Sequence, residues 1–374
     1  MKALAAVVRE AGAAFVVEPV ELAAPGDFEV LVEIAGTGIC QTDLSAWKQD
    51  LPFSLPAVLG HEGAGIVRAV GQFVRKVAPG DPVVLTFDSC GECRNCGLGL
   101  SSYCAQFRER NVSGRRRDGS SALRDANGGV LAGSFFGQSS FATYSLASER
   151  NVVRLPGGLP LEAAGPLGCG VQTGAGAVLN VLRPPEGSSI AVFGAGAVGM
   201  SAIMAAKAAS CATIIAVDLH EARLREAITF GATHGVDASR EDPVAAVRRI
   251  TGSGAGFSVE CTGVPAVLRQ AVESLDIPGK CCLTGLAPSG KAFEIEMNQL
   301  LRGRTIAGTL EGDSDPDTFI PRLIGLWKEG RFPFDRLVRR YPLDRINDAV
   351  ADMRASRAIK PVLIANPQLS GATL

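Results

Sequence analysis

Four closely spaced cysteines in the first third of the chain form a pattern that can bind a metal ion. The pattern is C-x2-C-x2-C-x7-C, and its members are Cys90, Cys93, Cys96 and Cys104. In a reducing compartment such spacing favours a metal over disulfides. Four thiolates make a closed tetrahedral site that stabilises a fold, so we predict a structural zinc. A four-cysteine iron–sulfur site is less favoured, because the spacing matches neither ferredoxin pattern.

A glycine-rich turn in the second half of the chain has the spacing that binds a dinucleotide. Gly194, Gly196 and Gly199 fit G-x-G-x-x-G, between an apolar β-branched run and an alanine-rich run. In this motif the first glycine makes a tight turn, the second lets the backbone approach a pyrophosphate, and the third lets helix pack against strand. The N–H groups that begin the helix, near Val198, then hold the phosphates. Outside this strand–turn–helix context the glycines would indicate only an ordinary turn.

An acidic residue at the end of the next predicted strand selects the dinucleotide. Asp218 follows Gly199 by 19 residues. A carboxylate at this place accepts the ribose hydroxyls of NAD and repels the 2′-phosphate of NADP. Arg223 could soften that repulsion, although its helical spacing from Leu219 also suits a solvent-facing residue. We therefore predict NAD as the cofactor.

The other cysteines and the three histidines divide into structural and candidate functional residues. Cys40 and Cys169 are isolated in the sequence. His220 and His234 are interpreted as structural residues. The third histidine, His61, differs because a carboxylate follows it directly, between two predicted strands. Four further cysteines lie in or beside apolar runs and are interpreted as small buried hydrophobes: Cys211, Cys261, Cys281 and Cys282.

Composition limits the class of protein. The 374 residues are 47% hydrophobic and 20% charged, with a net charge of −1, which indicates a globular protein long enough for two domains. This balance favours neither nucleic acid nor a membrane surface as partner, and the one basic run, 108–117, is interrupted by Glu109, Ser113 and Gly114. No apolar run reaches about twenty residues, and the N-terminal one is too short for a signal peptide. We expect a cytoplasmic protein with a small-molecule substrate.

Two kinds of element must position these residues. Residues 1 to about 85 alternate short apolar runs with Gly/Pro turns, which is typical of a mainly-β unit. Residues 107–140 are rich in Arg, Ser, Gly and Asp and are predicted to be a long surface excursion. From residue 190 strands alternate with helices, which predicts a parallel, doubly wound sheet. A helix at 319–328 and a strand near 361–364 follow.

These patterns predict the domain organisation. We expect a first domain at 1–171, with the cysteine lobe at about 86–106. A dinucleotide-binding domain should follow at 172–310. Residues 311–374 are expected to return to the first domain.

In combination, the motifs resemble the zinc-dependent medium-chain alcohol dehydrogenases over essentially the whole chain. The match comprises Cys40-x-Thr42-Asp43, Gly60-His61-Glu62-Gly63, the four-cysteine lobe, Cys169, the glycine turn and Asp218. Within that family the chain is most similar to the aryl (benzyl) and terpene (geraniol-type) alcohol dehydrogenases, in the stretches 135–144, 168–178, 311–314 and 359–363. The resemblance implies an α/β fold with a mainly-β GroES-like catalytic domain and a Rossmann domain.

The resemblance implies two zinc ions in each chain. Besides the structural zinc, a catalytic zinc would be bound by Cys40, His61 and Cys169, with an open fourth position. Glu62 would approach the metal transiently when water or product exchanges. Asp43 would be the partner for the other nitrogen of His61.

The implied reaction is NAD-dependent oxidation of an alcohol to an aldehyde. The zinc would lower the pKa of a bound alcohol, and Thr42 would accept its proton before hydride moves from the alkoxide to the nicotinamide. Gln41 and Lys360 are assigned to the cofactor, although Gln41 lacks the charge that many relatives carry there. Ser45 stands where the best-known relatives end the proton relay in histidine, so the last step needs a water.

Primary aromatic or allylic alcohols are the expected substrates. Their flat groups would fit an apolar slot, for which Trp47, Phe53 and Phe87 are candidates, although each suits core packing equally. A medium-chain aliphatic alcohol dehydrogenase is one alternative, and a zinc-free quinone or enone reductase of the same fold is another. A non-catalytic sensor or structural protein that binds zinc and NAD is a third. We expect a homodimer or homotetramer.

Overall fold

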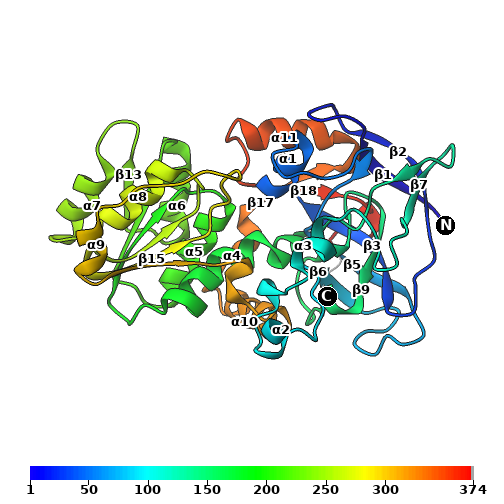
Figure 1. Cartoon of the computed structure of the whole chain (residues 1–374), viewed down its shortest axis with the longest axis horizontal. Coiled ribbons are helices and arrows are strands. Elements are labelled where there is room, and N and C mark those ends of the chain that lie inside the picture. Colours follow the sequence, from blue (N-terminus) through cyan, green and yellow to red (C-terminus); the bar gives the residue numbers. More distant parts are fainter. Residues whose placement is uncertain (372–374) are drawn as a thin grey trace. The chain divides into compact units, whose positions relative to one another are not determined.

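The structure is a computed structural model that describes residues 1–371. The described chain divides into two compact units (Figure 1). The first contains Met1–Cys169, Asp315–Pro321 and the segment from Asp335 onward, and the second contains Gly170–Ser314 and Arg322–Phe334. The predicted return of all of 311–374 to the first domain therefore differs from the observed division. Residues 322–334 belong to the second unit, where Phe332 and Phe334 are fully buried.

The first unit is built on two sheets. One has the strand order β4-β1-β2-β7-β8, with bounds Ala57–Val58, Lys2–Val8, Val16–Leu22, Leu123–Asp125 and Val130–Leu131. The other has the order β10-β6-β5-β3-β18-β17, and β9 also pairs with β3. Their bounds are Val152–Arg154, Pro82–Leu85, Gly63–Val70, Glu29–Gly38, Lys360–Ile364, Val338–Pro342 and Tyr144–Ser148. This unit is mainly β, in agreement with the sequence pattern.

The end of the chain completes the larger sheet. β18 pairs antiparallel with β3, with Val362 opposite Gly38 and Leu363 opposite Thr37. In Figure 1 the C-terminal strand accordingly lies among strands from the first part of the chain. Four of the five residues of β18 are buried, so this short strand brings residues from position 360 onward against the segment that leads into Cys40.

The helices of the first unit are short. α1 spans Gln41–Lys48 and is capped at its start by Asp43, whose carboxylate accepts a hydrogen bond from the backbone N–H of Cys40. It ends where Gln49 adopts a left-handed conformation at φ 68°, a common way to terminate a helix. The others are α2, Arg94–Gly97, α3, Phe107–Val112, and α11, Ile346–Arg354.

The second unit is a six-stranded parallel sheet, which confirms the predicted doubly wound fold. Its order is β13-β12-β11-β14-β15-β16, with bounds His234–Asp237, Thr213–Asp218, Ser189–Phe193, Ala255–Glu260, Leu275–Leu283 and Arg304–Gly308. Side chains alternate between the two faces of a strand, yet every residue from Ile190 to Phe193 is buried. Both faces must therefore be covered, as helices cover them in such sheets.

In the second unit, α4 precedes the first strand and the other helices alternate with the strands. The helices are α4, Gly170–Gly176; α5, Ala197–Ala208; α6, Glu221–Phe230; α7, Pro243–Thr251; α8, Pro265–Glu273; and α9, Met297–Leu301. A further helix, α10, spans Pro316–Lys328 and begins in the first unit. Among the described residues, no helix is long and apolar enough to cross a membrane.

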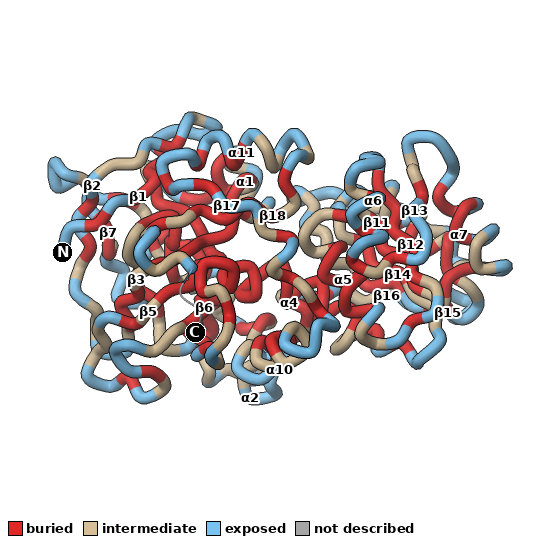
Figure 2. The backbone as a smooth tube through the Cα atoms, turned by 180° about the vertical axis from the view of Figure 1, so that it is seen from behind, coloured by how far each residue is buried: buried red, intermediate tan, exposed pale blue. Residues whose placement is uncertain are grey.

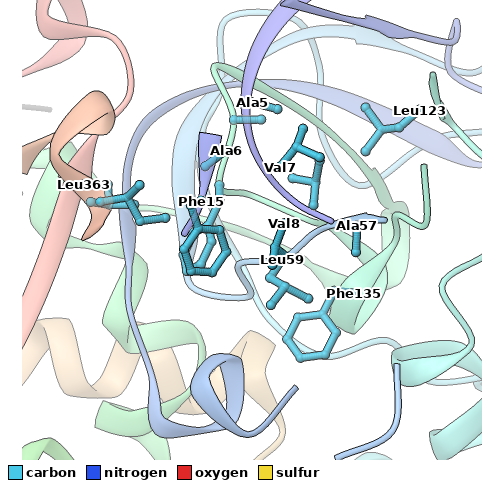
Figure 3. Close-up of a cluster of buried hydrophobic side chains, with 14 of the residues drawn as sticks. Ala5, Ala6, Val7, Val8, Phe15, Ala57, Leu59, Leu123, Phe135 and Leu363 are labelled. Carbon is cyan, nitrogen blue, oxygen red and sulfur yellow. The ribbon is translucent and has the colours of Figure 1, made fainter. Parts of the chain in front are cut away.

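Each unit has its own hydrophobic core, and buried residues follow the strands of both (Figure 2). In the first unit, the core joins residues of β1, such as Val7 and Val8, to Leu59, Phe135 and Leu363 from distant segments (Figure 3). Leu59 precedes His61 by two residues, and Phe135 lies in the predicted surface excursion. The main core of the first unit therefore lies directly beside the region that holds His61.

The prediction of a surface excursion at 107–140 is wrong in part. β7 pairs with β2 and extends the first sheet, and Phe135 and Phe136 are 0% and 8% exposed. The polar composition of the segment concealed this, although Leu123, Leu131, Phe135 and Phe136 are buried. The excursion thus contributes both to the core and to the surroundings of His61.

Candidate functional site

Four metal-binding side chains meet in the first unit. Cys40, His61, Glu62 and Cys169 each offer a ligand atom, and these atoms all lie within 4.8 Å of one another. Cys40 follows β3 and begins α1, while His61 and Glu62 lie between β4 and β5. Cys169 follows the turn Gly165–Gly168. The fold therefore brings together the three residues that the resemblance assigned to a catalytic zinc.

Asp43 sets the orientation of the imidazole. One of its carboxylate oxygens lies 2.9 Å from His61 Nδ1 and 3.1 Å from the backbone nitrogen of Gly60, and the other accepts from Cys40 N at 2.8 Å. A carboxylate can only accept here, so Nδ1 carries a hydrogen, and in the neutral imidazole, the form that binds a metal, Nε2 is the lone-pair nitrogen. His61 Nε2 is buried and has no hydrogen-bond partner. A buried nitrogen oriented in this way beside two thiols fits a metal ligand.

The environment shifts the acidity of these groups. Burial opposes a charged His61, but the carboxylate of Asp43 and the nearby Cys40 together outweigh it and raise the pKa of the imidazole well above its usual range. The pKa of Cys40 is lowered, chiefly by a hydrogen bond from Cys169 that stabilises the thiolate. Two sulfurs and one imidazole are a donor set that zinc binds with one position left open. The residues present therefore fit a catalytic zinc.

Lys360 and Glu62 form a buried ion pair beside these ligands. Lys360 Nζ lies 2.8 and 2.9 Å from the two carboxylate oxygens of Glu62 and donates to the carbonyl of Ile39 at 3.2 Å. Burial raises the pKa of Glu62, against the opposing effect of Lys360. For Lys360, burial lowers the pKa, but the combined attraction of Glu62 and the nearby Cys40 and Cys169 exceeds that effect, so its pKa is also raised. Lys360, which the resemblance assigned to the cofactor, thus donates from its ammonium group to the carboxylate of Glu62.

The predicted proton relay lies on the first turns of α1. Thr42 Oγ1 is 3.7 Å from Cys40 Sγ. Ser45 follows three residues later, which places both hydroxyl side chains on one face of the helix, and both residues are partly buried. Gln41, predicted to contact the cofactor, is exposed at the start of the helix.

Aromatic rings surround His61, and sequence reasoning missed the two nearest. The imidazole lies 4.6 Å from the Phe136 ring at an interplanar angle of 30° and 5.5 Å from the Phe135 ring, edge to face. Of the earlier candidates, Phe53 packs against Phe135 at 4.9 Å and Phe87 against Phe107 at 5.9 Å. No spacing signal distinguishes Phe135 and Phe136 in the sequence, since their position depends on the fold of the excursion.

Trp47 is held away from the rings around His61. Its indole N–H donates to the carbonyl of Ala13 at 2.6 Å. Its ring stacks with Phe15 at 6.3 Å and lies under the guanidinium of Arg354. These contacts use both the polar and the apolar parts of the side chain, so core packing accounts for Trp47.

The four-cysteine lobe also assembles a metal site. The ligand atoms of Cys90, Cys93, Cys96 and Cys104 lie within 4.8 Å of one another. Backbone N–H groups point at the sulfurs, among them Cys93 N to Cys90 Sγ at 3.3 Å and Cys90 N to Cys104 Sγ at 3.2 Å. The N–H of Ala105 lowers the pKa of Cys93 to about 6, whereas burial raises that of Cys96 to about 12. Four converging sulfurs with amide donors fit a closed structural zinc.

In the second unit, the glycine turn has the geometry of a phosphate-binding loop. Gly194 adopts φ +92°, and a side chain at Gly199 would place its Cβ 1.8 Å from the carbonyl of Gly194. A Cβ at Gly196 would meet nothing within 4 Å, so the backbone there is open to a ligand. The next residue, Ala197, begins α5, which also contains Val198. The turn therefore fits a pyrophosphate at a helix start.

Asp218 lies directly behind this turn. Its carboxylate accepts from the backbone nitrogens of Ala195 at 2.7 Å and His220 at 2.9 Å. Arg223 Nη1 is 3.8 Å away, and the Nε of Arg223 is buried without a hydrogen-bond partner. The carboxylate and the guanidinium thus both occupy the end of β12, where the ribose of a dinucleotide would be read.

Comparison with known proteins shows the family to which the chain belongs. The family model for the alcohol dehydrogenase GroES-like domain matches residues 26–157, and that for zinc-binding dehydrogenases matches residues 197–326. Geraniol dehydrogenase of Castellaniella defragrans is 43% identical over 97% of this chain and 98% of its own.

Two solved structures are similar over nearly their whole length. An alcohol dehydrogenase zinc-binding domain protein from Burkholderia ambifaria is 52% identical with a TM-score of 0.96, over 97% of this chain and 99% of that one. Benzyl alcohol dehydrogenase from Acinetobacter calcoaceticus is 44% identical with a TM-score of 0.95, over 98% and 100%.

Proposed function

The chain belongs to the zinc-dependent medium-chain alcohol dehydrogenases, close to the aryl and terpene alcohol dehydrogenases, and from this we propose that it oxidises primary aromatic or allylic alcohols to aldehydes with NAD. One observation carries the proposal. His61 directs an unpartnered Nε2 toward two thiols while Phe135 and Phe136 pack on the same imidazole. A metal ligand set and an aromatic wall therefore share one residue.

We propose that Cys40, His61 and Cys169 hold one zinc and the cysteine lobe holds a second. Zinc at the first site would supply a Lewis acid that lowers the pKa of an alcohol hydroxyl. The carboxylate of Asp43 keeps the imidazole in its ligating orientation. Thr42 is close enough to Cys40 to accept the hydroxyl proton of a substrate bound there. Ser45, one turn further along α1, would pass it on through a water.

For the cofactor, the glycine turn and Asp218 support NAD over NADP. Asp218 is only 8% exposed, and a 2′-phosphate placed at the end of β12 would meet its charge. Arg223 offsets part of the repulsion, because its guanidinium lies within 4 Å of the same carboxylate.

The substrate class follows from the rings at His61. Phe53, Phe135 and Phe136 are in edge-to-face contact, which gives an apolar wall suited to a flat unsaturated group. The names of the two relatives, geraniol and benzyl alcohol dehydrogenase, support the same class. Conjugation also stabilises the aldehyde product. We include a homodimer or homotetramer in the proposal, which light scattering would test.

Metal analysis and a substrate panel test the function. We expect two zinc ions per chain and, with NAD, kcat/KM for benzyl alcohol and geraniol at least roughly a hundredfold above ethanol and 2-propanol, as one or two pocket contacts can supply. If the protein is instead a medium-chain aliphatic alcohol dehydrogenase, 1-hexanol should have the highest kcat/KM of the panel. Zinc and NAD binding without turnover of any alcohol would instead support a sensor or structural protein.

A further inference from the structure

A single buried amide connects the backbone segment that carries His61 to that of Thr86. Gln138 lies just after the 3-10 turn Phe135–Gly137 and is 2% exposed. Its side-chain nitrogen donates to the carbonyl of His61 at 2.9 Å and to that of Thr86 at 3.2 Å, and its side-chain oxygen accepts from Gly63 N at 3.0 Å. All three partners are backbone groups, and two of them flank Glu62.

The connection extends toward a second ligand, Cys169. Thr86 follows β6, and its hydroxyl donates to the carbonyl of Gly168 at 2.7 Å. Gly168 immediately precedes Cys169 and packs so closely on β6 that a Cβ there would lie 2.0 Å from the carbonyl of Leu85. Gln138 therefore holds the backbone of His61 directly and, through Thr86, that of Gly168, the residue before Cys169.

The partners demand a carboxamide at this position. Gly63 N can only donate, and the carbonyls of His61 and Thr86 can only accept, so the site needs one acceptor and two donor hydrogens. Glutamate would set an oxygen against two carbonyls, and an apolar side chain would leave three buried backbone groups without this partner. The close approach of the Gln138 amide requires glycine at position 63, because a Cβ there would lie 3.1 Å from Gln138 Oε1 and 2.7 Å from Ser140 Cβ.

The backbone of the same residue is fixed as well. Its N–H donates to the carbonyl of Phe135 at 3.1 Å, and its carbonyl accepts from the hydroxyl of Ser145 at 2.6 Å. Two residues on, Ser140 N donates to the carbonyl of Gly60 at 2.9 Å. Hydrogen bonds thus hold both the backbone and the side chain of Gln138. A fixed side chain can in turn hold its backbone partners in place.

We propose that Gln138 is a positioning residue for the catalytic metal: it sets the placement of His61 and, through Thr86, of Cys169. The inference rests on the catalytic zinc site of the proposed function. Groups that orient metal ligands typically change affinity or activity by 10–100-fold when removed. The described hydrogen bonds of the Gln138 side chain all go to backbone atoms and none to the side chain of a metal ligand. Gln138 would therefore act on the ligands through their backbone alone.

Gln138→Met tests this proposal, because it keeps the length of the side chain and removes all three hydrogen bonds that the side-chain amide makes. With cobalt(II) exchanged into the catalytic site, we expect altered visible bands and a roughly 10–100-fold faster loss of cobalt to a chelator. The value of kcat should fall by at least roughly tenfold on the same basis. The dissociation constant for NAD, measured by fluorescence, should stay within about twofold. Gln138→Glu, which keeps the acceptor for Gly63, should change the bands and cobalt loss in the same direction and serves if the methionine variant does not fold.

Asn111 supplies a matched control. This fully buried amide also makes three backbone hydrogen bonds, to Asp88 N at 2.8 Å, Asp88 O at 2.9 Å and Phe107 O at 2.7 Å. None of them goes to a catalytic ligand. Asn111→Leu should lower the thermal midpoint while leaving the cobalt bands and release rate as in the wild type.

Two outcomes would overturn the inference in distinguishable ways. If Gln138→Met loses thermal stability as Asn111→Leu does but keeps wild-type cobalt bands and release, Gln138 is structural only. If the wild-type protein binds a single metal per chain, in the cysteine lobe, the proposed catalytic zinc site itself is wrong and the inference falls with it.

Discussion

The ammonium of Lys360 bonds both carboxylate oxygens of Glu62, at 2.8 and 2.9 Å, across 298 residues of sequence. The side chains are 2% and 0% exposed. Because both charges are removed from water, each depends on the other for its stabilisation. The pair also fixes where β18 meets the segment that carries His61.

Lys360→Met should therefore destabilise the protein by about 3–5 kcal/mol, since it leaves a buried carboxylate without its cation. The double variant Glu62→Gln/Lys360→Met should recover part of the loss, because no unpaired charge remains. Thermal midpoints of the three proteins check this. A single variant with a wild-type midpoint and weakened NAD binding would instead support the cofactor role predicted for Lys360.

The two metal sites should respond differently to loss of one ligand. Cys169→Ser removes a ligand from an open site, so we expect a folded protein with one zinc and no turnover. Cys96→Ser opens a closed site whose metal contributes folding energy, so soluble yield and thermal midpoint should fall first. Zinc content, midpoint and activity are measured for both. Wild-type activity in Cys169→Ser would refute the ligand assignment.

Asp218→Ala should erode the preference for NAD over NADP. The substitution removes the charge that would repel a 2′-phosphate and leaves Arg223 free to attract it. We expect the ratio of kcat/KM values for the two cofactors to change by at least about tenfold, equivalent to about 1.4 kcal/mol. Arg223→Ala is the matched control and should shift the ratio the other way. A wild-type protein that prefers NADP would contradict the assignment.

Tyr341 should make stability depend on pH in the alkaline range. Burial, and then the hydrogen bond to Asp352 at 2.7 Å, raise the pKa of Tyr341 to about 12, above the usual value of about 10. A raised pKa in the folded state gives stability that is complete below about pH 10 and lost as pH rises toward about 12.

The check compares the wild type with Tyr341→Phe. The thermal midpoint of the wild type should fall more steeply between about pH 10 and 12 than that of the variant. Only three tyrosines are present, so an absorbance titration of tyrosinate should lose its highest component in Tyr341→Phe. Equal slopes in the two proteins would show that the folded state does not raise the pKa of Tyr341.

The sequence predicted the features that depend on local pattern. Strand–turn–helix alternation gave the parallel sheet, and close cysteine spacing gave the lobe. By contrast, Cys40, His61 and Cys169 could be grouped only through resemblance, since nothing in their spacing says that three distant segments meet. The pairing of Lys360 with Glu62 and the amide of Gln138 were not foreseen for the same reason. Each depends on which backbone groups the fold places opposite one another.

The excursion shows a different limit. The polar composition of residues 107–140 indicated a solvent-exposed segment, but Phe135 and Phe136 are buried. Ser134, Phe136 and Ser139 in this turn all have positive φ. Non-glycine residues seldom adopt that conformation and cost roughly 1–3 kcal/mol each when they do. No propensity rule predicts such a turn, because tertiary contacts maintain it.

Phe136 should set the preference for aromatic substrates. Its ring lies 4.6 Å from His61, and its backbone is held at φ 50°, so a smaller residue would open space directly beside the metal ligand. In Phe136→Ala we expect the ratio of kcat/KM for benzyl alcohol over 1-hexanol to fall by about tenfold, within the 1–3 kcal/mol that a pocket contact supplies. Phe136→Leu keeps most of the apolar volume, so its ratio should lie between those of the wild type and Phe136→Ala.

Phe73→Leu is the control for this prediction, since Phe73 is 47% exposed and pairs with Phe28 rather than with His61. Steady-state kinetics of the wild type and of every variant with NAD decide the matter. The left-handed backbone at position 136 adds a second criterion, because glycine is relaxed there and alanine is not. Phe136→Gly should therefore match Phe136→Ala in selectivity while retaining a higher thermal midpoint. If both variants keep the wild-type ratio, the ring does not contact the substrate and its role is confined to packing on His61.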